Sequence, residues 1–123
     1  MPVERAQDHP VFELAGNTIT SLASGRRGAT ESVLFRVEMP AGSGLPPHHH
    51  DHLDVFTIVE GSGTVHIDDV STEIVAGDSA VVPVGARHRV DAGPNGATLV
   101  VTMLAGTKIF RDDGSEGVPD WVS

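Results

Sequence analysis

Short valine-rich hydrophobic runs, separated by glycine, proline and aspartate, follow one another along most of this chain. Within residues 32–39, the hydrophobic residues Val, Phe, Val and Met alternate with Leu, Arg and Glu. This period of two predicts a β-strand with one face in a hydrophobic core. No stretch keeps the helical period beyond about one turn. The pattern therefore predicts an all-β protein.

The same reading predicts strands at residues 17–24, 32–39, 55–60, 63–67, 79–82, 88–91 and 97–104. Two glycine-rich segments, 61–63 (Gly-Ser-Gly) and 93–96 (Gly-Pro-Asn-Gly), predict turns between neighbouring strands. No predicted helix is long enough to cover a parallel sheet. Many short strands with this spacing are typical of a β-sandwich or a closed barrel.

A length of 123 residues predicts a single domain over residues 1–123, with a polar C-terminal tail at 111–123. Trp121, the only tryptophan, lies in this tail, and we expect it to cap an open end of a barrel or to pack on a partner chain. Because there is no cysteine, a metal could be bound only by imidazole and oxygen ligands.

The charge and the N-terminus narrow the possible partners. The formal net charge is −9, with 17 acidic and 8 basic residues, so a nucleic-acid partner is not expected. The N-terminus has no basic segment leading into an apolar one, and no apolar run is long enough to span a membrane. The sequence predicts a cytoplasmic protein without membrane association.

Four of the seven histidines fall within residues 48–52. On an extended strand His48 and His50 point to one side, and His49 points to the other. Two prolines immediately before His48 restrict the backbone and lower the cost of ordering the segment. Asp54 starts the next strand and would place a carboxylate beside the two imidazoles. A polar, exposed turn or an adventitious metal binder is the alternative interpretation of this cluster.

A second segment, Gly77-Asp-Ser-Ala-Val-Val-Pro-Val-Gly-Ala-Arg-His88, brings in a distant histidine. The first segment reads G-(x)5-H-x-H-(x)3-D-(x)6-G from Gly42 to Gly61, and the second reads G-(x)5-P-x-G-(x)2-H. In order and spacing the two resemble the conserved motifs of the cupin superfamily, with core motifs at 42–92. The resemblance implies a cupin double-stranded β-helix, a jelly-roll barrel. It also implies metal ligands at His48, His50, Asp54 and His88.

Two positions depart from the cupin pattern. Asp54 stands where the family usually has glutamate, so its carboxylate is one methylene shorter, and His52 or a water could complete the ligand set instead. Ala92 stands where asparagine is common, and we interpret this position as structural. Imidazole and carboxylate ligands suit a divalent transition metal, namely Fe, Mn, Ni, Cu, Co or Zn.

Such a site predicts a metal-dependent enzyme with a small-molecule substrate. The favoured reaction is dioxygenase-like oxidation of a small phenolic or enolic compound. A polyketide cyclase or isomerase using a Lewis-acid metal, and a non-catalytic metal- or ligand-binding cupin, are the alternatives. Asp54 would act first as a ligand and also as a catalytic base on partial release, and His52 would be a catalytic base if it turned inward. The resemblance also implies a homodimer.

Other side chains around the motifs have simpler expected roles. His66 lies in the middle of a predicted strand and is expected to point outward, into solvent. Arg87 and Arg89 flank His88, so alternation predicts that both point away from the metal. We expect the cavity wall to be apolar. Its expected residues are Phe35, Phe56, Ile58, Val90 and Met103.

Overall fold

A computed structural model describes residues 3–123, which form a strongly curled β-sheet with two short 3₁₀ turns at Ala6–Asp8 and Gly25–Arg27. The all-β prediction is confirmed. The strands are β1 (Val11–Leu14), β2 (Asn17–Ala23), β3 (Ser32–Met39), β4 (His48–His50), β5 (Asp54–Ile67), β6 (Val70–Val75), β7 (Ser79–Val82), β8 (His88–Leu104), β9 (Ile109–Arg111) and β10 (Glu116–Gly117).

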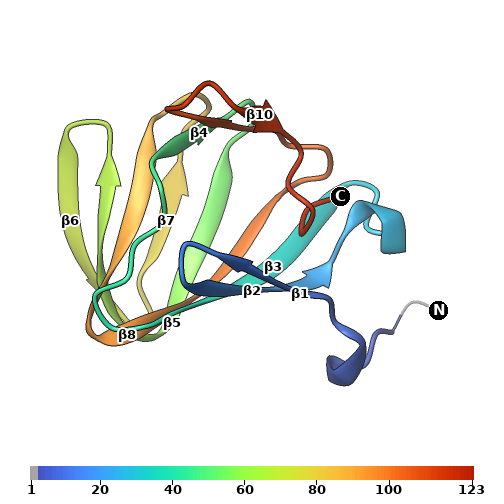
Figure 1. The fold of residues 1–123 in the computed structure, drawn as a ribbon, viewed down its shortest axis with the longest axis horizontal. Coiled ribbons are helices and arrows are strands. Elements are labelled where there is room, and N and C mark those ends of the chain that lie inside the picture. The colour runs from blue at the N-terminus through green and yellow to red at the C-terminus, as the bar shows by residue number, and fades with distance from the viewer. Residues whose placement is uncertain (1–2) are drawn as a thin grey trace.

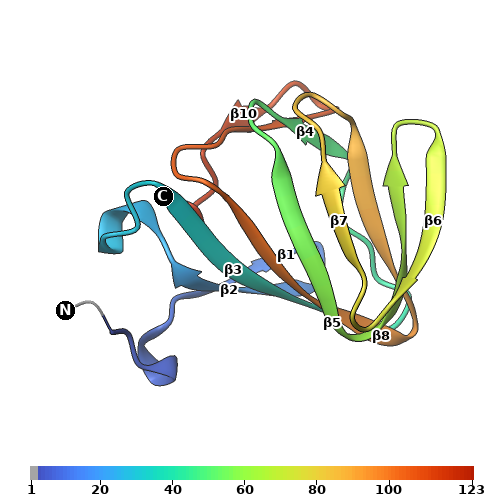
Figure 2. The same cartoon turned by 180° about the vertical axis from the view of Figure 1, so that it is seen from behind.

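Two long strands, β5 and β8, run antiparallel to each other and belong to both halves of the curled sheet (Figure 1, Figure 2). In one half, residues 97–104 of β8 lie between β3 and the start of β5, and β7 pairs with β5 beyond them. In the other half, residues 88–92 pair with the end of β5, and β6 extends that side. The short strand β4 begins opposite His88 and connects β8 to β9 and β10.

The predicted turns at 61–63 and 93–96 are wrong, because both segments lie inside continuous strands. They mark the place where β5 and β8 bend from one half of the sheet into the other, and the register of β5 against β8 shifts between Gly61 and Gly63. Gly61 has φ +76°, and a Cβ there would collide with the carbonyl oxygen of Gly96. The glycines permit a bulged corner with close backbone contact, which the local sequence does not distinguish from a turn.

Replacement of Gly61 by alanine is expected to lower the free energy of unfolding by at least about 2 kcal/mol, because the positive φ and the backbone collision both oppose a side chain. Urea unfolding monitored by circular dichroism would measure this. Gly28→Ala is the matched control, since Gly28 also has a positive φ but nothing lies within 4 Å of its added Cβ. That change should cost about 1 kcal/mol. Equal effects of the two substitutions would contradict the corner interpretation.

The inner face of the curled sheet is the hydrophobic core. The alternation predicted for residues 32–39 is confirmed, with Val33, Phe35 and Val37 buried. Along β5, Asp54 is buried on the same face as Phe56 and Ile58, at 4 %, 4 % and 0 % exposure. A carboxylate is therefore held among apolar side chains. Within residues 3–123, no helix has the length and apolar character needed to cross a membrane.

Candidate metal centre

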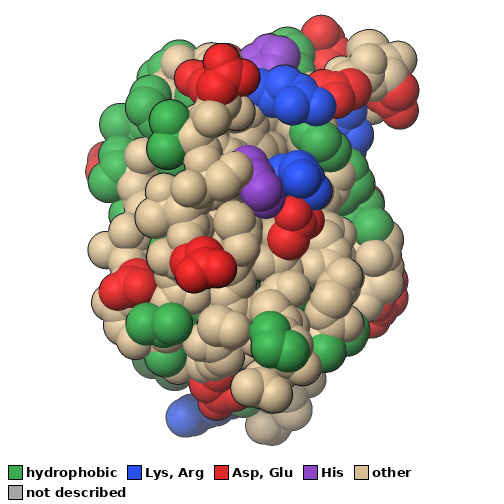
Figure 3. Space-filling model, turned by 90° about the vertical axis from the view of Figure 1, so that its left-hand side faces the viewer, with side chains coloured by type: hydrophobic (Ala, Val, Ile, Leu, Met, Phe, Trp, Pro, Cys, Tyr) green, Lys and Arg blue, Asp and Glu red, His purple; other side chains and the backbone are tan. Residues whose placement is uncertain are grey.

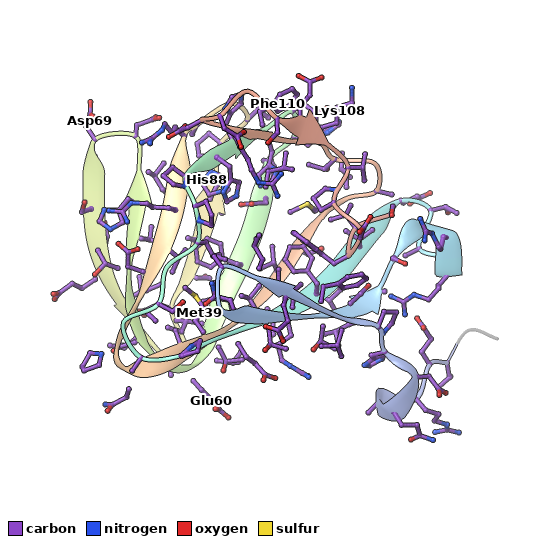
Figure 4. All side chains as sticks on the ribbon, in the orientation of Figure 1. Met39, Glu60, Asp69, His88, Lys108 and Phe110 are labelled. Atoms are coloured by element: carbon purple, nitrogen blue, oxygen red, sulfur yellow. The ribbon has the colours of Figure 1, made fainter. Side chains whose placement is uncertain are left out.

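The strand β4 lies between β8 and β9 and holds two of the predicted ligands in place. His48 is the register partner of His88, the first residue of β8, and both imidazoles face the inside of the curled sheet. His50 follows two residues later on the same face, with 6 % exposure. His49 points to the opposite face, where its ring stacks on Phe110 with the centroids 5.0 Å apart. In Figure 4, His88 lies inside the curled sheet and Phe110 lies at its rim.

The three inward histidines form one compact cluster. Their ring centroids are 4.3 Å apart for His48 and His88, 4.8 Å for His48 and His50, and 5.2 Å for His50 and His88. One potential ligand atom of each lies within 4.8 Å of the others. Side chains from two separate strands thus converge on a point that one ion could occupy.

Backbone carbonyls fix which ring nitrogen of each histidine carries the hydrogen. The Nδ1 atom of His48 is 2.8 Å from the Pro46 oxygen, that of His50 is 3.1 Å from the Lys108 oxygen, and that of His88 is 2.9 Å from the Ala86 oxygen. Because a carbonyl only accepts hydrogen bonds, each Nδ1 is the donor, and each neutral ring keeps its lone pair on Nε2. This is the second-sphere arrangement that orients histidine ligands.

Asp54 completes the electron-rich cluster. Its Oδ2 atom is 3.3 Å from Nε2 of His50 and 3.5 Å from Nε2 of His88. Its Oδ1 atom is buried and has no hydrogen-bond partner among the described residues. Burial acts to raise the pKa of Asp54, but hydrogen bonds from Nε2–H groups, which His50 and His88 carry only in their protonated forms, outweigh it and hold the pKa at about 2. The carboxylate is therefore ionised at neutral pH.

These residues fit a bound divalent metal. Two Nε2 lone pairs face one oxygen of an ionised carboxylate whose other oxygen has no partner, and such an arrangement requires a positive charge among its members. Three imidazoles with one carboxylate are a donor set for transition metals, as the sequence predicted. The cluster whose potential ligand atoms all lie within 4.8 Å of one another consists of the three histidines and does not include Asp54. Direct binding of a metal by Asp54 therefore stays a prediction.

Burial also lowers the pKa of His48, from 6.5 to about 4, with a further contribution from the neighbouring His88. The folded protein thus favours the neutral form of this imidazole, which is the form that binds metal. In the unfolded chain the ordinary pKa applies, so between pH 6.5 and 4 the unfolded state binds more protons than the folded state.

The metal-free protein is therefore expected to lose about 2 kcal/mol of unfolding free energy as the pH falls from 6.5 to 4, allowing for partial exposure of His48. Asp54 contributes outside this window, because its stabilising effect is lost only as the pH falls from 3.8 toward 2. Urea unfolding at pH 7 and 4.5 measures the loss. His48→Gln should remove much of the slope, and an unchanged slope in this variant would contradict the assignment.

A cavity opens beside the cluster. The space available to the centre of a water molecule there is about 60 Å³, which corresponds to about four to six waters. Its wall is largely apolar, and four of the five residues expected to line it do so, whereas Ile58 lies in the core behind it. The expected residues at the cavity are Phe35, Phe56, Val90 and Met103.

Other histidines lie outside this cluster. The structure does not bring His52 to it, because its side chain is 42 % exposed and its Nδ1 atom is 3.0 Å from a carboxylate oxygen of Asp51. On the outer face, Nε2 of His66 lies 2.9 Å from Asp91, which also pairs with Arg89. Arg87 is paired with an aspartate as well. Acidic side chains are spread over the face in Figure 3, and most Lys and Arg side chains seen there lie in its upper half.

Two arginines that the sequence did not lead us to expect line the cavity. Arg89, which alternation predicted to point away from the metal, contributes to the cavity wall while its guanidinium pairs with Asp91. Arg111 lines the cavity from β9, although its place in the sequence indicates only the start of the C-terminal tail. Trp121 and Val122 of the same tail also line the cavity, and Trp121 packs at 6.1 Å from Phe12, between ring centroids. Alternation around 109–111 offered a weak signal, but it could not say which strand these residues pair with.

Comparison with protein families identifies the class of protein that this fold and site define. The sequence profile of the Cupin_2 family, described as a cupin domain, matches residues 35–105. The chain belongs to the cupin family. The resemblance in the two histidine motifs is thereby confirmed, and so is the jelly-roll fold.

Individual relatives share parts of this chain. A dimethylsulfoniopropionate lyase, DddW of Ruegeria pomeroyi, is 36 % identical over 77 residues, which are 62 % of this chain and 51 % of the lyase. The chain therefore spans about half the length of that relative. An RmlC-like cupin from Shewanella frigidimarina has a TM-score of 0.74 at 24 % identity, covering 85 % of this chain and 90 % of the other. The polyketide cyclase RemF from Streptomyces resistomycificus has a TM-score of 0.72 at 23 % identity, covering 85 % and 79 %. These two structures establish similarity of fold.

Proposed function

We propose that the protein is a metal-dependent enzyme that transforms a small, oxygen-rich molecule. One observation carries this proposal: the ligand atoms of three oriented histidines and the carboxylate of Asp54 gather beside a largely apolar cavity. A surface histidine cluster without a function would not need three backbone acceptors to orient its rings. Perturbed titratable groups in a cavity are typical of functional sites.

His48, His50 and His88 would hold the metal, with Asp54 as a fourth ligand or an adjacent base. When bound, the metal supplies Lewis acidity and, if it is redox-active, electron transfer. The chain has no tyrosine and no cysteine. Asp54 is thus the acid–base group that remains at the cavity, and its free Oδ1 could hold a proton taken from the substrate. The apolar wall excludes water and strengthens these electrostatic interactions.

The size of the cavity limits the substrate. A space of about 60 Å³ favours a small enolic or carboxylic compound over a fused-ring phenol. Oxidative, dioxygenase-like chemistry on a small enolic compound is the first reaction that we propose for a redox-active metal. A lyase reaction, in which a base removes a proton next to a carboxylate, is the second, and it is favoured by the 36 % identity to a dimethylsulfoniopropionate lyase.

Metal analysis of the untagged protein, followed by reconstitution with Fe(II), Mn(II) or Zn(II), tests the proposal. Dioxygen consumption with acetylacetone would indicate the oxidative reaction. Release of dimethyl sulfide from dimethylsulfoniopropionate would indicate the lyase reaction. A protein that binds metal but transforms neither compound, nor a panel of small enols and carboxylates, would be the non-catalytic binding cupin. A protein that binds no transition metal would contradict the proposal.

Two further features of the whole protein stay proposals. A homodimer is supported by exposed valines on the outer face of the sheet, of which Val70 is 65 % and Val81 is 62 % exposed. A cytoplasmic location is the second. Analytical ultracentrifugation would address the first of these, and localisation in cells the second.

A further inference from the structure

Arg111 occupies a defined place beside the histidine cluster. It is the register partner of His48 across the antiparallel pair β4 and β9. Directly opposite residues of such a pair point to the same face, with Cβ atoms about 4.5–5.5 Å apart. His48 faces the cavity, so Arg111 does too. The neighbouring pairs agree, because Ile109 lines the cavity opposite His50, whereas Phe110 stacks on His49 outside.

The guanidinium of Arg111 is uncommitted. Within residues 3–123 its side chain makes no hydrogen bond and no ion pair, although it is half-buried. Arg89 is the other arginine at the cavity, and it is paired with Asp91 at 2.8 Å. The pKa of Asp113 is lowered by its hydrogen bonds with Ser115 and, to a smaller extent, by the charge of Arg111, but Asp113 makes no ion pair with Arg111. The guanidinium therefore still lacks the bidentate carboxylate that it prefers.

The charges at the site also favour an anion. Three neutral imidazoles and the Asp54 carboxylate would leave a bound divalent ion with one net positive charge, and Arg111 adds a second. The chain as a whole has a formal charge of −9, so this cavity would be a local exception in a protein that otherwise repels anions. The remaining wall is largely apolar and would not recognise a neutral polar molecule.

We propose that Arg111 binds a carboxylate of the substrate, which makes the substrate a small carboxylic acid; this inference rests on the proposed function. One end of the molecule would pair with the Arg111 guanidinium, and an oxygen at the other end would reach the histidine cluster. Because His48 and Arg111 are directly opposed, a chain of only a few atoms spans the two groups. The small cavity has room for such a chain.

Titration calorimetry with malonate, and with malonamide as its neutral isostere, tests this assignment on metal-free and zinc-loaded protein. The wild-type protein should bind malonate more tightly than malonamide. Arg111→Gln should weaken malonate binding about ten-fold or more, without changing malonamide binding or zinc content. Arg111→Lys should restore part of the affinity, because it keeps the charge without the planar fork. Arg36→Gln is the matched control, since Arg36 pairs with Glu38 on the outer face, and it should bind like wild type.

Several outcomes would overturn the role of Arg111. These are equal malonate binding by the wild type and Arg111→Gln, no preference for malonate over malonamide in the wild type, or no malonate binding at all. The comparison on metal-free wild-type protein, in which malonate cannot gain affinity by binding zinc directly, keeps the test decisive even if Arg111→Gln folds poorly. Failure to bind zinc would instead contradict the proposed function. In that case the malonate preference of metal-free wild-type protein, and its loss in Arg111→Gln, would still report on Arg111.

Discussion

Replacement of His88 by alanine is expected to lower the affinity for divalent transition metal by more than about 100-fold, since the loss of even an outer-sphere partner of a ligand costs 10–100-fold. His88 is 6 % exposed, and its Nδ1 atom donates a hydrogen bond to the Ala86 carbonyl. This hydrogen bond fixes the orientation of the ring and therefore the direction of its Nε2 lone pair. Alanine leaves two imidazoles, and no other described histidine lies near enough to replace the third. Metal content after dialysis and competition with a chromophoric chelator would measure the change.

His66→Ala is the matched control for this experiment. His66 also lies on a central strand and also contacts an aspartate, but it does so on the outer face. It should retain metal like the wild-type protein. A thermal melt of both variants would separate loss of metal from loss of fold. Unchanged metal content in His88→Ala would refute the ligand assignment.

Asp54→Asn is expected to reduce turnover of the substrate about 10²–10⁴-fold and also to weaken metal binding. Asparagine keeps the shape of the side chain but removes the negative charge that the neighbouring histidines stabilise. It also removes the only carboxylate that lies against the histidine cluster within the described chain. Turnover measured at saturating metal separates the loss of the base from the loss of the metal.

The outer-face variant Asp91→Asn provides the comparison, because Asp91 contacts a histidine at a similar distance but does not line the cavity. Its turnover should match that of the wild-type protein. Full activity of Asp54→Asn at saturating metal would exclude Asp54 as the base. Asp54 would then be a metal ligand or a structural residue alone.

Much of the candidate site could be predicted from the sequence because its geometry is local. A period of two places His48 and His50 on one side, and it likewise places Asp54 on the side of Phe56. Only the approach of His88 needed long-range information, and the resemblance of the two motifs to cupins supplied it. The alternation is preserved in the folded protein because it is a property of a single strand, and each motif spans two consecutive strands with the short connection between them.

Features that depend on pairing between distant segments could not be predicted in this way. The residues around Gly61 and Gly96, taken by themselves, predict turns. Their positive φ values instead allow a bend at which β5 and β8 approach each other closely. Arg111 and His48 are distant in the chain, and nothing in either neighbourhood indicates that β9 pairs with β4. Trp121 was expected to cap an open end of the barrel or to pack on a partner chain, and only the long-range path of the tail places it at the cavity, against Phe12.

Lys108 and the strand β9 that follows it complete the histidine cluster from the C-terminal part of the chain. The carbonyl that orients His50 belongs to Lys108, which lies beyond the segment 35–105 that matches the family. During synthesis from the N-terminus, the ligands on β4 leave the ribosome well before the residues that orient them and cover their edge. A nascent chain that stops at residue 105 thus carries every histidine of the cluster but leaves one ring free to rotate. We therefore expect tight metal binding to begin only after Lys108 has been synthesised.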